Sequence, residues 1–247
     1  MPLVTETTRT TRSHSGRHLR LVTPKMHPED TVASGYTGAR RTLNLLVALV
    51  GLLVTLPLWI LIALAIKLTS RGPVFYTQVR VGLDTRTTGL GTNDPRRRVD
   101  LGGRPFTIYK FRTMTVDAEA GSGAVWAQKN DSRVTSIGKW LRLYRLDELP
   151  QLINVIKGEM NVVGPRPERP AIFADLRDGI PGYQRRQRTP PGITGHAQIN
   201  LEYDSSVDDV RRKLAYDIEY IERASFWQDL WIMLKTVPVM LFRKGSR

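Results

Sequence analysis

An adjacent pair of carboxylates, Asp147 and Glu148, lies among arginines in the second half of the chain. Arg142 and Arg145 precede the pair, and Arg166 follows it between two prolines that restrict its backbone. Arginine makes bidentate contacts with phosphate, and a carboxylate among cations stays ionised. Such a carboxylate can attack phosphorus or bind Mg²⁺, so the cluster indicates phosphoryl chemistry. The alternative is structural, because an acidic pair at the start of a helix also complements the helix dipole.

Other side chains extend or limit this chemistry. Lys110 and Arg112 end a predicted strand and are candidate phosphate ligands, and Glu168 follows the Pro-Arg-Pro turn. The chain has no Cys, which excludes thiolate metal sites and Cys nucleophiles. Three of the four His lie in the first 30 residues, and we assign no catalytic role to the fourth, His196. Acid–base or nucleophilic work therefore falls to carboxylates.

Composition points to anionic partners. The 247 residues carry a formal net charge of +14, with a pI near 10.4. Such a charge favours nucleic acid, an anionic lipid surface or phosphorylated substrates. No helix-turn-helix pattern and no basic platform with interleaved aromatics supports nucleic acid. The hydrophobic content of 41% is sufficient for a folded core.

The segment from Leu43 to Ile66 carries no charge and is long enough to span a bilayer core as a helix. Pro57 lies in its middle and should kink or break that helix, and the hydroxyl of Thr55 can satisfy a freed carbonyl. Both flanks are basic, so the positive-inside rule gives no clear orientation. The basic residues are Lys25, Arg40 and Arg41 before the segment and Lys67, Arg71, Arg80 and Arg86 after it. From composition alone, a helical hairpin that returns to the cytoplasmic side and a Pro-kinked span remain equal alternatives.

The rest of the chain predicts a small domain. Residues 1–40 are interpreted as a disordered basic tail, 41–69 as the membrane helix and 70–247 as the folded domain. Strands are predicted at 74–82 and 104–114, with helices at 136–145, 149–158 and 207–223. Residues 82–103, which contain an Arg triplet, are predicted to form a solvated or lipid-touching basic loop. The C-terminal segment after 225 fits either an amphipathic helix in the membrane interface or a core helix.

Several long stretches resemble the bacterial sugar transferase family, the monotopic phosphoglycosyl transferases that act on polyprenyl phosphate. They are KFRTM (110–114), RLDELPQLINVIKGEMNVVGPRPE (145–168), PGITGHAQIN (191–200), KLAYDIEYIE (213–222) and DLWIMLKT (229–236). The resemblance covers about residues 40–245 in order and is specific because several blocks are long. The chain resembles a short form of the family, without the multi-span N-terminal region of larger members.

This resemblance implies a reaction and roles for residues. The family transfers a hexose 1-phosphate from a UDP-sugar to undecaprenyl phosphate and so starts a lipid-linked exopolysaccharide or glycan. Asp147 would be the nucleophile that forms a covalent sugar-phosphoryl aspartate and the main Mg²⁺ ligand, with Glu148 as its dyad partner. Arg142 and Arg166 match phosphate-binding positions of the family, while Lys110, Arg112, Arg145 and Glu168 remain candidates from the residues themselves.

The resemblance also implies a fold and a location. We expect an α/β, mostly helical, small cytoplasmic domain with an N-terminal re-entrant membrane helix hairpin broken at Pro57 and interfacial amphipathic helices. It would lie at the cytoplasmic face of the bacterial inner membrane. The expected partners are a UDP-sugar, undecaprenyl phosphate, inner-membrane lipid and downstream glycosyltransferases, with no nucleic acid. The alternative function is a membrane-tethered basic module that binds anionic lipid or nucleic acid, and the sequence does not name the sugar, the polymer or the oligomeric state.

Overall fold

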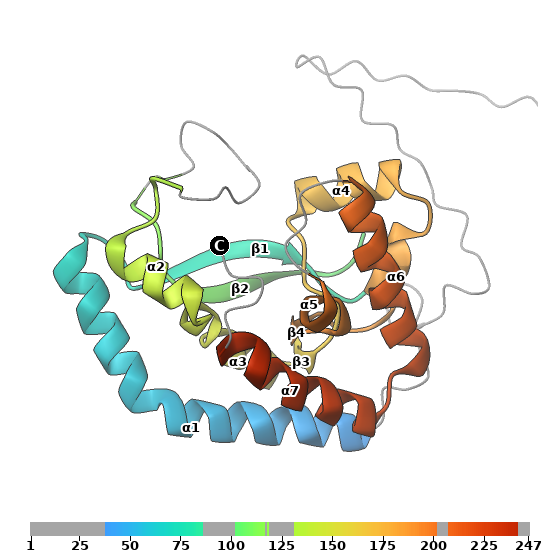
Figure 1. Ribbon diagram of the computed structural model, residues 1–247, viewed down its shortest axis with the longest axis horizontal. Helices are drawn as coiled ribbons and strands as arrows, with labels where there is room; N and C mark the ends of the chain where they lie inside the picture. Colours follow the sequence, from blue (N-terminus) through green and yellow to red (C-terminus); the bar gives the residue numbers. More distant parts are fainter. Residues whose placement is uncertain (1–37, 86–101, 117, 119–130, 202–206, 242–247) are drawn as a thin grey trace, which may run out of the picture.

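The computed structural model describes residues 38–85, 102–116, 118, 131–201 and 207–241, and the predicted tail before residue 38 lies outside them. This part is mostly helical, with two small two-stranded sheets (Figure 1). The elements in chain order are α1 Gly38–Thr69, β1 Phe75–Val81, β2 Pro105–Phe111, α2 Ser136–Leu143, the 3-10 helix η3 Leu146–Glu148, α3 Gln151–Lys157, β3 Asn161–Val163, α4 Pro170–Gly179, the 3-10 helix η4 Tyr183–Arg188, β4 Gly192–Thr194, α5 His196–Asn200, α6 Val207–Arg223 and α7 Phe226–Leu241.

Both predicted strands are confirmed. β1 pairs antiparallel with β2, with Phe75 opposite Phe111 and Val81 opposite Pro105. Most of the 82–103 loop that joins them lies outside the described residues. β3 and β4 form a second, parallel pair that the sequence did not reveal. Each of these strands has only three residues, too few for an alternating pattern to be recognised.

The predicted helices at 136–145, 149–158 and 207–223 are confirmed as α2, α3 and α6. The side chain of Thr135 caps α2 by accepting a hydrogen bond from Gly138 N at 3.0 Å. Gly158 ends α3 with a φ of 80°, a left-handed conformation that glycine adopts at little cost. The elements α4, α5 and η4 were not predicted, because they lie in stretches interrupted by Pro and Gly.

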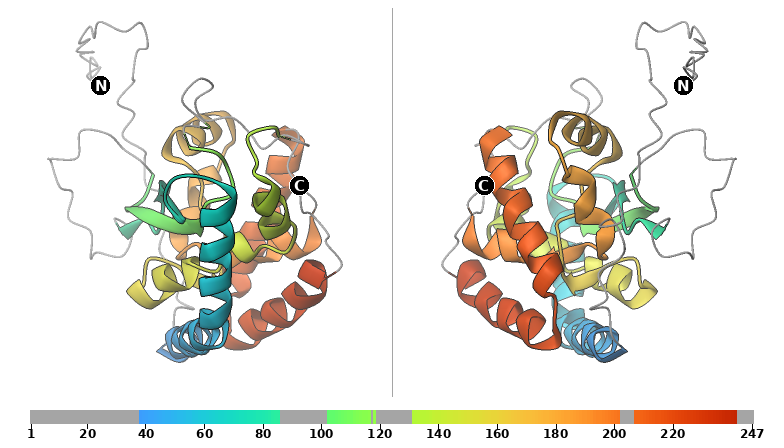
Figure 2. Two further views of the ribbon diagram at one scale, coloured as in Figure 1. Left: turned by 90° about the vertical axis from the view of Figure 1, so that its left-hand side faces the viewer. Right: turned by 90° about the vertical axis from the view of Figure 1, so that its right-hand side faces the viewer.

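The long apolar helix α1 bends at its middle. It is continuous across Pro57 and L-shaped, so that its two halves diverge instead of lying side by side (Figures 1 and 2). Of the two predicted effects of Pro57, a kink and a break, the structure shows the kink. The Thr55 hydroxyl donates to Gly51 O at 2.7 Å, while the carbonyl that Pro57 deprives of its donor is that of Leu53. The indole Nε1 of Trp59 donates to Thr55 Oγ1 at 3.1 Å, which adds a side-chain contact across the bend.

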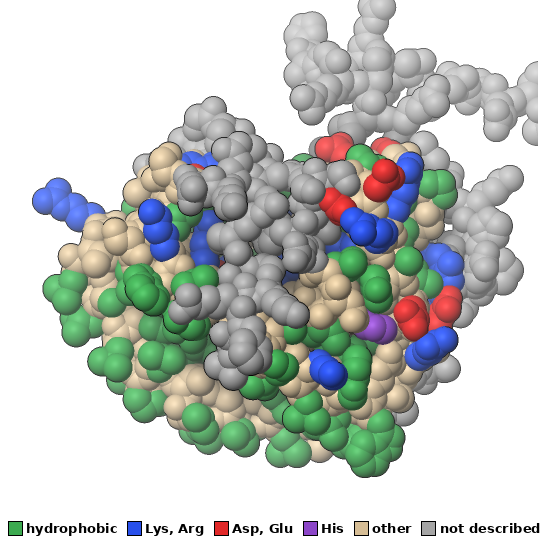
Figure 3. Space-filling view, in the orientation of Figure 1, with side chains coloured by type: hydrophobic (Ala, Val, Ile, Leu, Met, Phe, Trp, Pro, Cys, Tyr) green, Lys and Arg blue, Asp and Glu red, His purple; other side chains and the backbone are tan. Residues whose placement is uncertain are grey.

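The surface of α1 shows that it is not a core helix. Its outward side chains are apolar and exposed, with Val54 73% and Leu53 71% accessible. By length and composition α1 can enter a membrane. Figure 3 shows hydrophobic side chains gathered along the edge formed by α1 and α7. In α7 the exposed apolar residues are Trp227, Trp231, Leu234 and Val237.

Polar contacts fasten the N-terminal end of α1 to the domain. The fully buried Arg40 donates to Asp229 of α7, with Nε 2.8 Å from Oδ2 and Nη2 3.2 Å from Oδ1. Arg40 Nη2 also donates to the hydroxyl of Tyr220 in α6 at 2.7 Å. Asn44, one turn further on, accepts a hydrogen bond from Val162 N of β3 at 2.6 Å. These contacts set the position of α1 relative to the domain.

We expect Asp229→Asn to lower the free energy of unfolding by about 3–5 kcal/mol, because the buried Arg40 charge loses its counterion. Denaturant unfolding of the protein in detergent would measure this loss. Glu219→Gln is the control: Glu219 pairs with Arg223 on the exposed face of α6, and its loss should change the free energy by no more than about 0.5 kcal/mol. Equal effects of the two variants would contradict a structural role for the Arg40–Asp229 pair.

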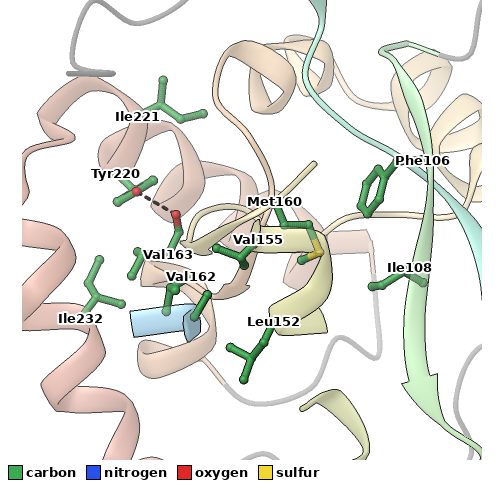
Figure 4. Close-up of a cluster of buried hydrophobic side chains, with 11 residues drawn as sticks. Phe106, Ile108, Leu152, Val155, Met160, Val162, Val163, Tyr220, Ile221 and Ile232 are labelled. Atoms are coloured by element: carbon green, nitrogen blue, oxygen red, sulfur yellow. Dashed lines mark hydrogen bonds between the residues drawn. The ribbon is translucent and has the colours of Figure 1, made fainter. Parts of the chain in front are cut away.

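The main hydrophobic core joins β2, α3, α6 and α7 (Figure 4). Ile108 of β2 and Leu152 of α3 belong to it, and the Tyr220 hydroxyl lies 3.1 Å from Val163 O. Because β2 packs on α3, the end of β2 that carries Lys110 lies close to the start of α3. Residues 147 and 148 lie in η3, shortly before α3 begins at Gln151, so this core positions the candidate chemistry.

Candidate active site

The short 3-10 helix η3 presents the carboxylate pair. Arg145 precedes it with a φ of 54°, the only positive value among the described non-glycine residues. This left-handed turn redirects the chain from α2 into η3 and is unfavourable for a side chain other than glycine. Asp147 and Glu148 are both buried.

Glu148 is held by two cations. Lys110 Nζ lies 3.0 Å from its Oε1, and Arg166 Nη2 lies 2.5 Å from the same oxygen. Arg166 Nη1 donates to Oε2 at 3.2 Å, so the arginine contact is bidentate. Burial by itself would raise the pKa of Glu148, but the charges of Arg166 and Lys110 outweigh it and hold that pKa well below its usual range. Glu148 is therefore ionised, with both oxygens engaged.

The carboxylate of Asp147 differs from that of Glu148 in its contacts and in the direction of its pKa shift. Within the part of the chain that the structure describes, no hydrogen bond or ion pair engages its carboxylate. Burial raises the pKa of Asp147, and the neighbouring Glu148 charge adds to the rise, whereas Lys110 and Arg142 oppose it. The two adjacent carboxylates thus differ in environment. Asp147 is the one available to a ligand.

The remaining predicted site residues are divided among three places. Arg142 stays at the dyad, where its Nε donates to Thr113 Oγ1 at 2.9 Å and its charge acts on Asp147. Arg145 acts electrostatically on Glu148. Arg112 is buried and donates to the backbone carbonyl of Ser70 at 3.0 Å, just beyond the end of α1. Its predicted contact with phosphate remains a prediction, since in the structure it holds the end of α1.

Glu168 belongs to a neighbouring network. Lys213 Nζ lies 3.1 Å from its Oε1, and Arg186 Nη1 lies 3.6 Å from the same atom. Burial would raise the pKa of Glu168, but the charges of Lys213 and Arg186 lower it to about 2. The structure therefore brings together Lys110, Asp147, Glu148 and Arg166, with Glu168 bound on the other side of the Pro-Arg-Pro turn.

Sequence reasoning missed the residues of this second network. Arg186 Nε donates to Asp217 Oδ2 at 2.7 Å, and both side chains are almost completely buried. One signal was present: Asp217 falls on the apolar face of the predicted 207–223 helix, with Val210, Leu214 and Ile221. A carboxylate on such a face requires a buried partner. Arg186, the partner of Asp217, lies 31 residues away in the chain. Sequence spacing does not indicate which cation would meet Asp217.

His196, to which no catalytic role was assigned, lies in an aromatic environment. Its ring centroid is 5.3 Å from that of Tyr216 and 6.3 Å from that of Trp231, both in edge-to-face geometry. The imidazole joins α5 to α6 and α7 as an aromatic ring would.

A buried, unengaged carboxylate among cationic side chains, on a domain fastened to an apolar helix, is the arrangement expected of a protein that binds phosphorylated compounds. The comparisons with known proteins narrow this class. The model of the family described as bacterial sugar transferase matches residues 35–90 and 95–243, and the chain belongs to that family.

Individual relatives agree with this assignment. The chain is 39% identical over 212 residues to a UDP-N-acetylgalactosamine-undecaprenyl-phosphate N-acetylgalactosaminephosphotransferase of Aeromonas hydrophila, covering 86% of this chain and 46% of that protein. It is 42% identical over 170 residues to a putative undecaprenyl-phosphate N-acetylgalactosaminyl 1-phosphate transferase of Bacillus subtilis, covering 69% and 80%. It is 35% identical over 242 residues to the exopolysaccharide production protein ExoY of Rhizobium meliloti, covering 90% and 95%.

Some relatives are much longer than this chain. The match spans 46% of the Aeromonas protein and 39% of a UDP-glucose:undecaprenyl-phosphate glucose-1-phosphate transferase of Klebsiella pneumoniae. The shared region contains Asp147, Glu148 and Arg166, since the family match runs through all three positions.

Proposed function

We propose that the protein transfers a hexose 1-phosphate from a UDP-sugar to undecaprenyl phosphate and thereby starts a lipid-linked glycan or exopolysaccharide. The names of the Aeromonas and Klebsiella relatives describe this type of transfer. The observation that carries the proposal is the different state of the two carboxylates. The negative charge of Glu148 is balanced by ion pairs with Lys110 and Arg166, while the carboxylate of Asp147 is unengaged and lies near the same cations.

This difference supports Asp147 as the nucleophile. A carboxylate oxygen of Asp147 would form a bond to the β-phosphorus of the donor, and the bond from that phosphorus to the bridging oxygen would break and release UMP. The phosphate of undecaprenyl phosphate would then attack the same phosphorus, and the bond to Asp147 would break. Glu148 is a poor nucleophile in comparison, since both of its oxygens are bound to cations.

The cationic side chains would lower the barrier by electrostatic stabilisation. The donor diphosphate and the Asp147 carboxylate are both anionic, so attack of the carboxylate on phosphorus requires compensating positive charge. Lys110, Arg142 and Arg166 each act on Asp147 electrostatically. Glu148 holds Lys110 and Arg166 in place before substrate binds. Such preorganisation avoids reorganisation during the reaction.

Mg²⁺ is the proposed cofactor. Among the described residues no group of three or more His, Cys, Asp or Glu side chains could hold a metal. Mg²⁺ is commonly held by one or two carboxylates together with substrate phosphates, so a single available carboxylate suits it. Asp147 would be its protein ligand, and the ion would supply charge neutralisation of the diphosphate when bound.

The proposed location is the cytoplasmic face of the bacterial inner membrane, with α1 re-entrant in one leaflet. The bend near Pro57 and the basic residues at both ends of α1 support it, since Arg40 and Arg41 lie at one end and Lys67 and Arg71 at the other. Basic flanks remain on the cytoplasmic side. A re-entrant helix would also place the dyad near headgroup depth, where the lipid phosphate lies.

We expect both termini to face the cytoplasm. Because the protein has no Cys, the variants Thr10→Cys and Ser246→Cys each give a single label site. An impermeant maleimide should label both positions only after the inner membrane is opened, and the unmodified Cys-free protein is the control. Labelling of position 10 from the periplasm of intact cells would contradict the re-entrant arrangement.

Turnover with purified protein tests the reaction itself. Detergent-solubilised enzyme would be given undecaprenyl phosphate, Mg²⁺ and, one at a time, UDP-glucose, UDP-galactose, UDP-N-acetylglucosamine and UDP-N-acetylgalactosamine. We expect UMP and a lipid-linked sugar phosphate with at least one donor and no product when EDTA is added. A basic binding module for anionic lipid or nucleic acid would release no UMP with any donor.

A further inference from the structure

The backbone of the turn that carries Arg166 is held through its carbonyls. Its two prolines have no N–H, so the turn has little capacity to form a backbone ladder of its own. Every carbonyl from 165 to 168 nevertheless accepts a hydrogen bond from another part of the chain. The donors are Gly192 N to Pro165 O at 2.9 Å, Arg186 Nη2 to Arg166 O at 3.0 Å, Arg80 Nη1 to Pro167 O at 3.0 Å and Val81 N to Glu168 O at 3.0 Å.

Two of these four donors are arginine side chains, and Arg186 is the more constrained. It is 1% exposed and uses each of its three nitrogens. Nε donates to Asp217 Oδ2 at 2.7 Å, Nη1 to the Tyr183 hydroxyl at 2.6 Å and Nη2 to Arg166 O. The guanidinium is planar and rigid, so contacts at Nε and Nη1 also set the position of Nη2.

Stability alone does not explain why a charged side chain is buried here. Moving a guanidinium out of water costs several kcal/mol, and an apolar group of similar volume often gives equal or greater stability. Arg186 touches the backbone of the residue whose side chain binds both oxygens of Glu148. A hydrophobic side chain in its place could not donate to that carbonyl.

We propose that Arg186, anchored by Asp217, is a positioning residue for Arg166. It holds the Arg166 backbone so that the guanidinium of Arg166 meets Glu148 and, in the reaction, the donor diphosphate. This inference rests on the proposed function, because the effect of positioning is read as transfer activity. Arg186 itself contacts neither carboxylate of the dyad in the structure.

The variant Arg186→Lys separates positioning from simple charge pairing. Lysine keeps the positive charge for Asp217 but lacks the rigid fork, so it cannot serve Asp217, Tyr183 and the Arg166 carbonyl together. We expect kcat/KM to fall about tenfold in an otherwise wild-type protein. In an Arg166→Ala background we expect Arg186→Lys to lower kcat/KM by less than about twofold, since the side chain to be positioned is then absent.

Arg40→Lys is the matched control. Arg40 is equally buried and also binds a carboxylate and a tyrosine hydroxyl, those of Asp229 and Tyr220. The Arg40→Lys substitution should lower the thermal midpoint of unfolding. It should reduce kcat/KM by the same factor in the wild-type and Arg166→Ala backgrounds. Equal factors for Arg186→Lys in the two backgrounds would overturn the positioning role and leave Arg186 as a general stabilising residue.

A second readout does not depend on activity. Hydrogen–deuterium exchange of the peptide covering 161–168 should be about tenfold faster in Arg186→Lys than in wild type and unchanged in Arg40→Lys. If Arg186→Lys does not fold, Asp217→Asn replaces it, because that change loosens the anchor while keeping the arginine. If the wild-type protein releases no UMP, the proposed function fails, and the exchange result alone decides whether Arg186 holds the turn. Unchanged exchange at 161–168 in the folded variant would overturn the inference.

Discussion

Asp147→Asn should abolish sugar-phosphate transfer, with kcat reduced by at least about 10⁴-fold. The amide has the shape of the carboxylate but neither its negative charge nor its nucleophilic oxygen. Since the structure shows no described partner for the Asp147 carboxylate, the substitution breaks no described hydrogen bond or ion pair, and the protein should still fold and insert in membranes. UMP release by purified variant and wild type in the same detergent measures the loss.

A mass measurement distinguishes a nucleophile from a residue that only binds. Wild-type protein given the UDP-sugar alone, without lipid acceptor, should gain the mass of one sugar phosphate at Asp147, and Asp147→Asn should gain none. Asp178→Asn is the control, since Asp178 is 78% exposed at the end of α4 and should retain full activity. A near-wild-type rate in Asp147→Asn, or an adduct that maps to another residue, would rule out the assignment.

Arg166→Ala should have the second largest effect, lowering kcat/KM by about 10²–10³-fold. The Arg166 side chain is 28% exposed and would have a diphosphate to bind, and without it Glu148 keeps the contact with Lys110 at 3.0 Å. Because Lys110 still pairs with Glu148, the free energy of unfolding should fall by no more than about 2 kcal/mol. Kinetics over a range of donor concentrations, together with denaturant unfolding, separate the two effects.

Two further variants define the role of Arg166. Arg166→Lys should recover only part of the lost activity, since lysine cannot make the bidentate contact. Arg223→Ala removes an arginine from an exposed pair with Glu219 and should leave kcat/KM unchanged. If donor KM and kcat were unaltered in Arg166→Ala, Arg166 would have no part in donor binding or transfer.

The helix-forming and strand-forming patterns in the sequence predicted local structure well where they were long. The helix predicted at 149–158 is α3, which spans Gln151–Lys157. The three-residue strands β3 and β4 carried no such pattern, because each is too short for an alternation to be recognised. The bend of α1 was predicted at Pro57. The shape of the bent helix was not predicted, because it depends on what the two halves pack against.

Residue types alone made the carboxylate pair, its neighbouring arginines and the apolar helix candidates, because charge, Pro restriction and uninterrupted hydrophobicity are properties of neighbouring residues. Sequence could not reveal that Glu148 is paired while Asp147 is not, or that Arg112 and Glu168 face other partners. Nor could it pair Arg186 with Asp217 or Arg40 with Asp229. The cost of burying a charge demands some counterion, but only the packing of the helices and sheets decides which one lies within reach.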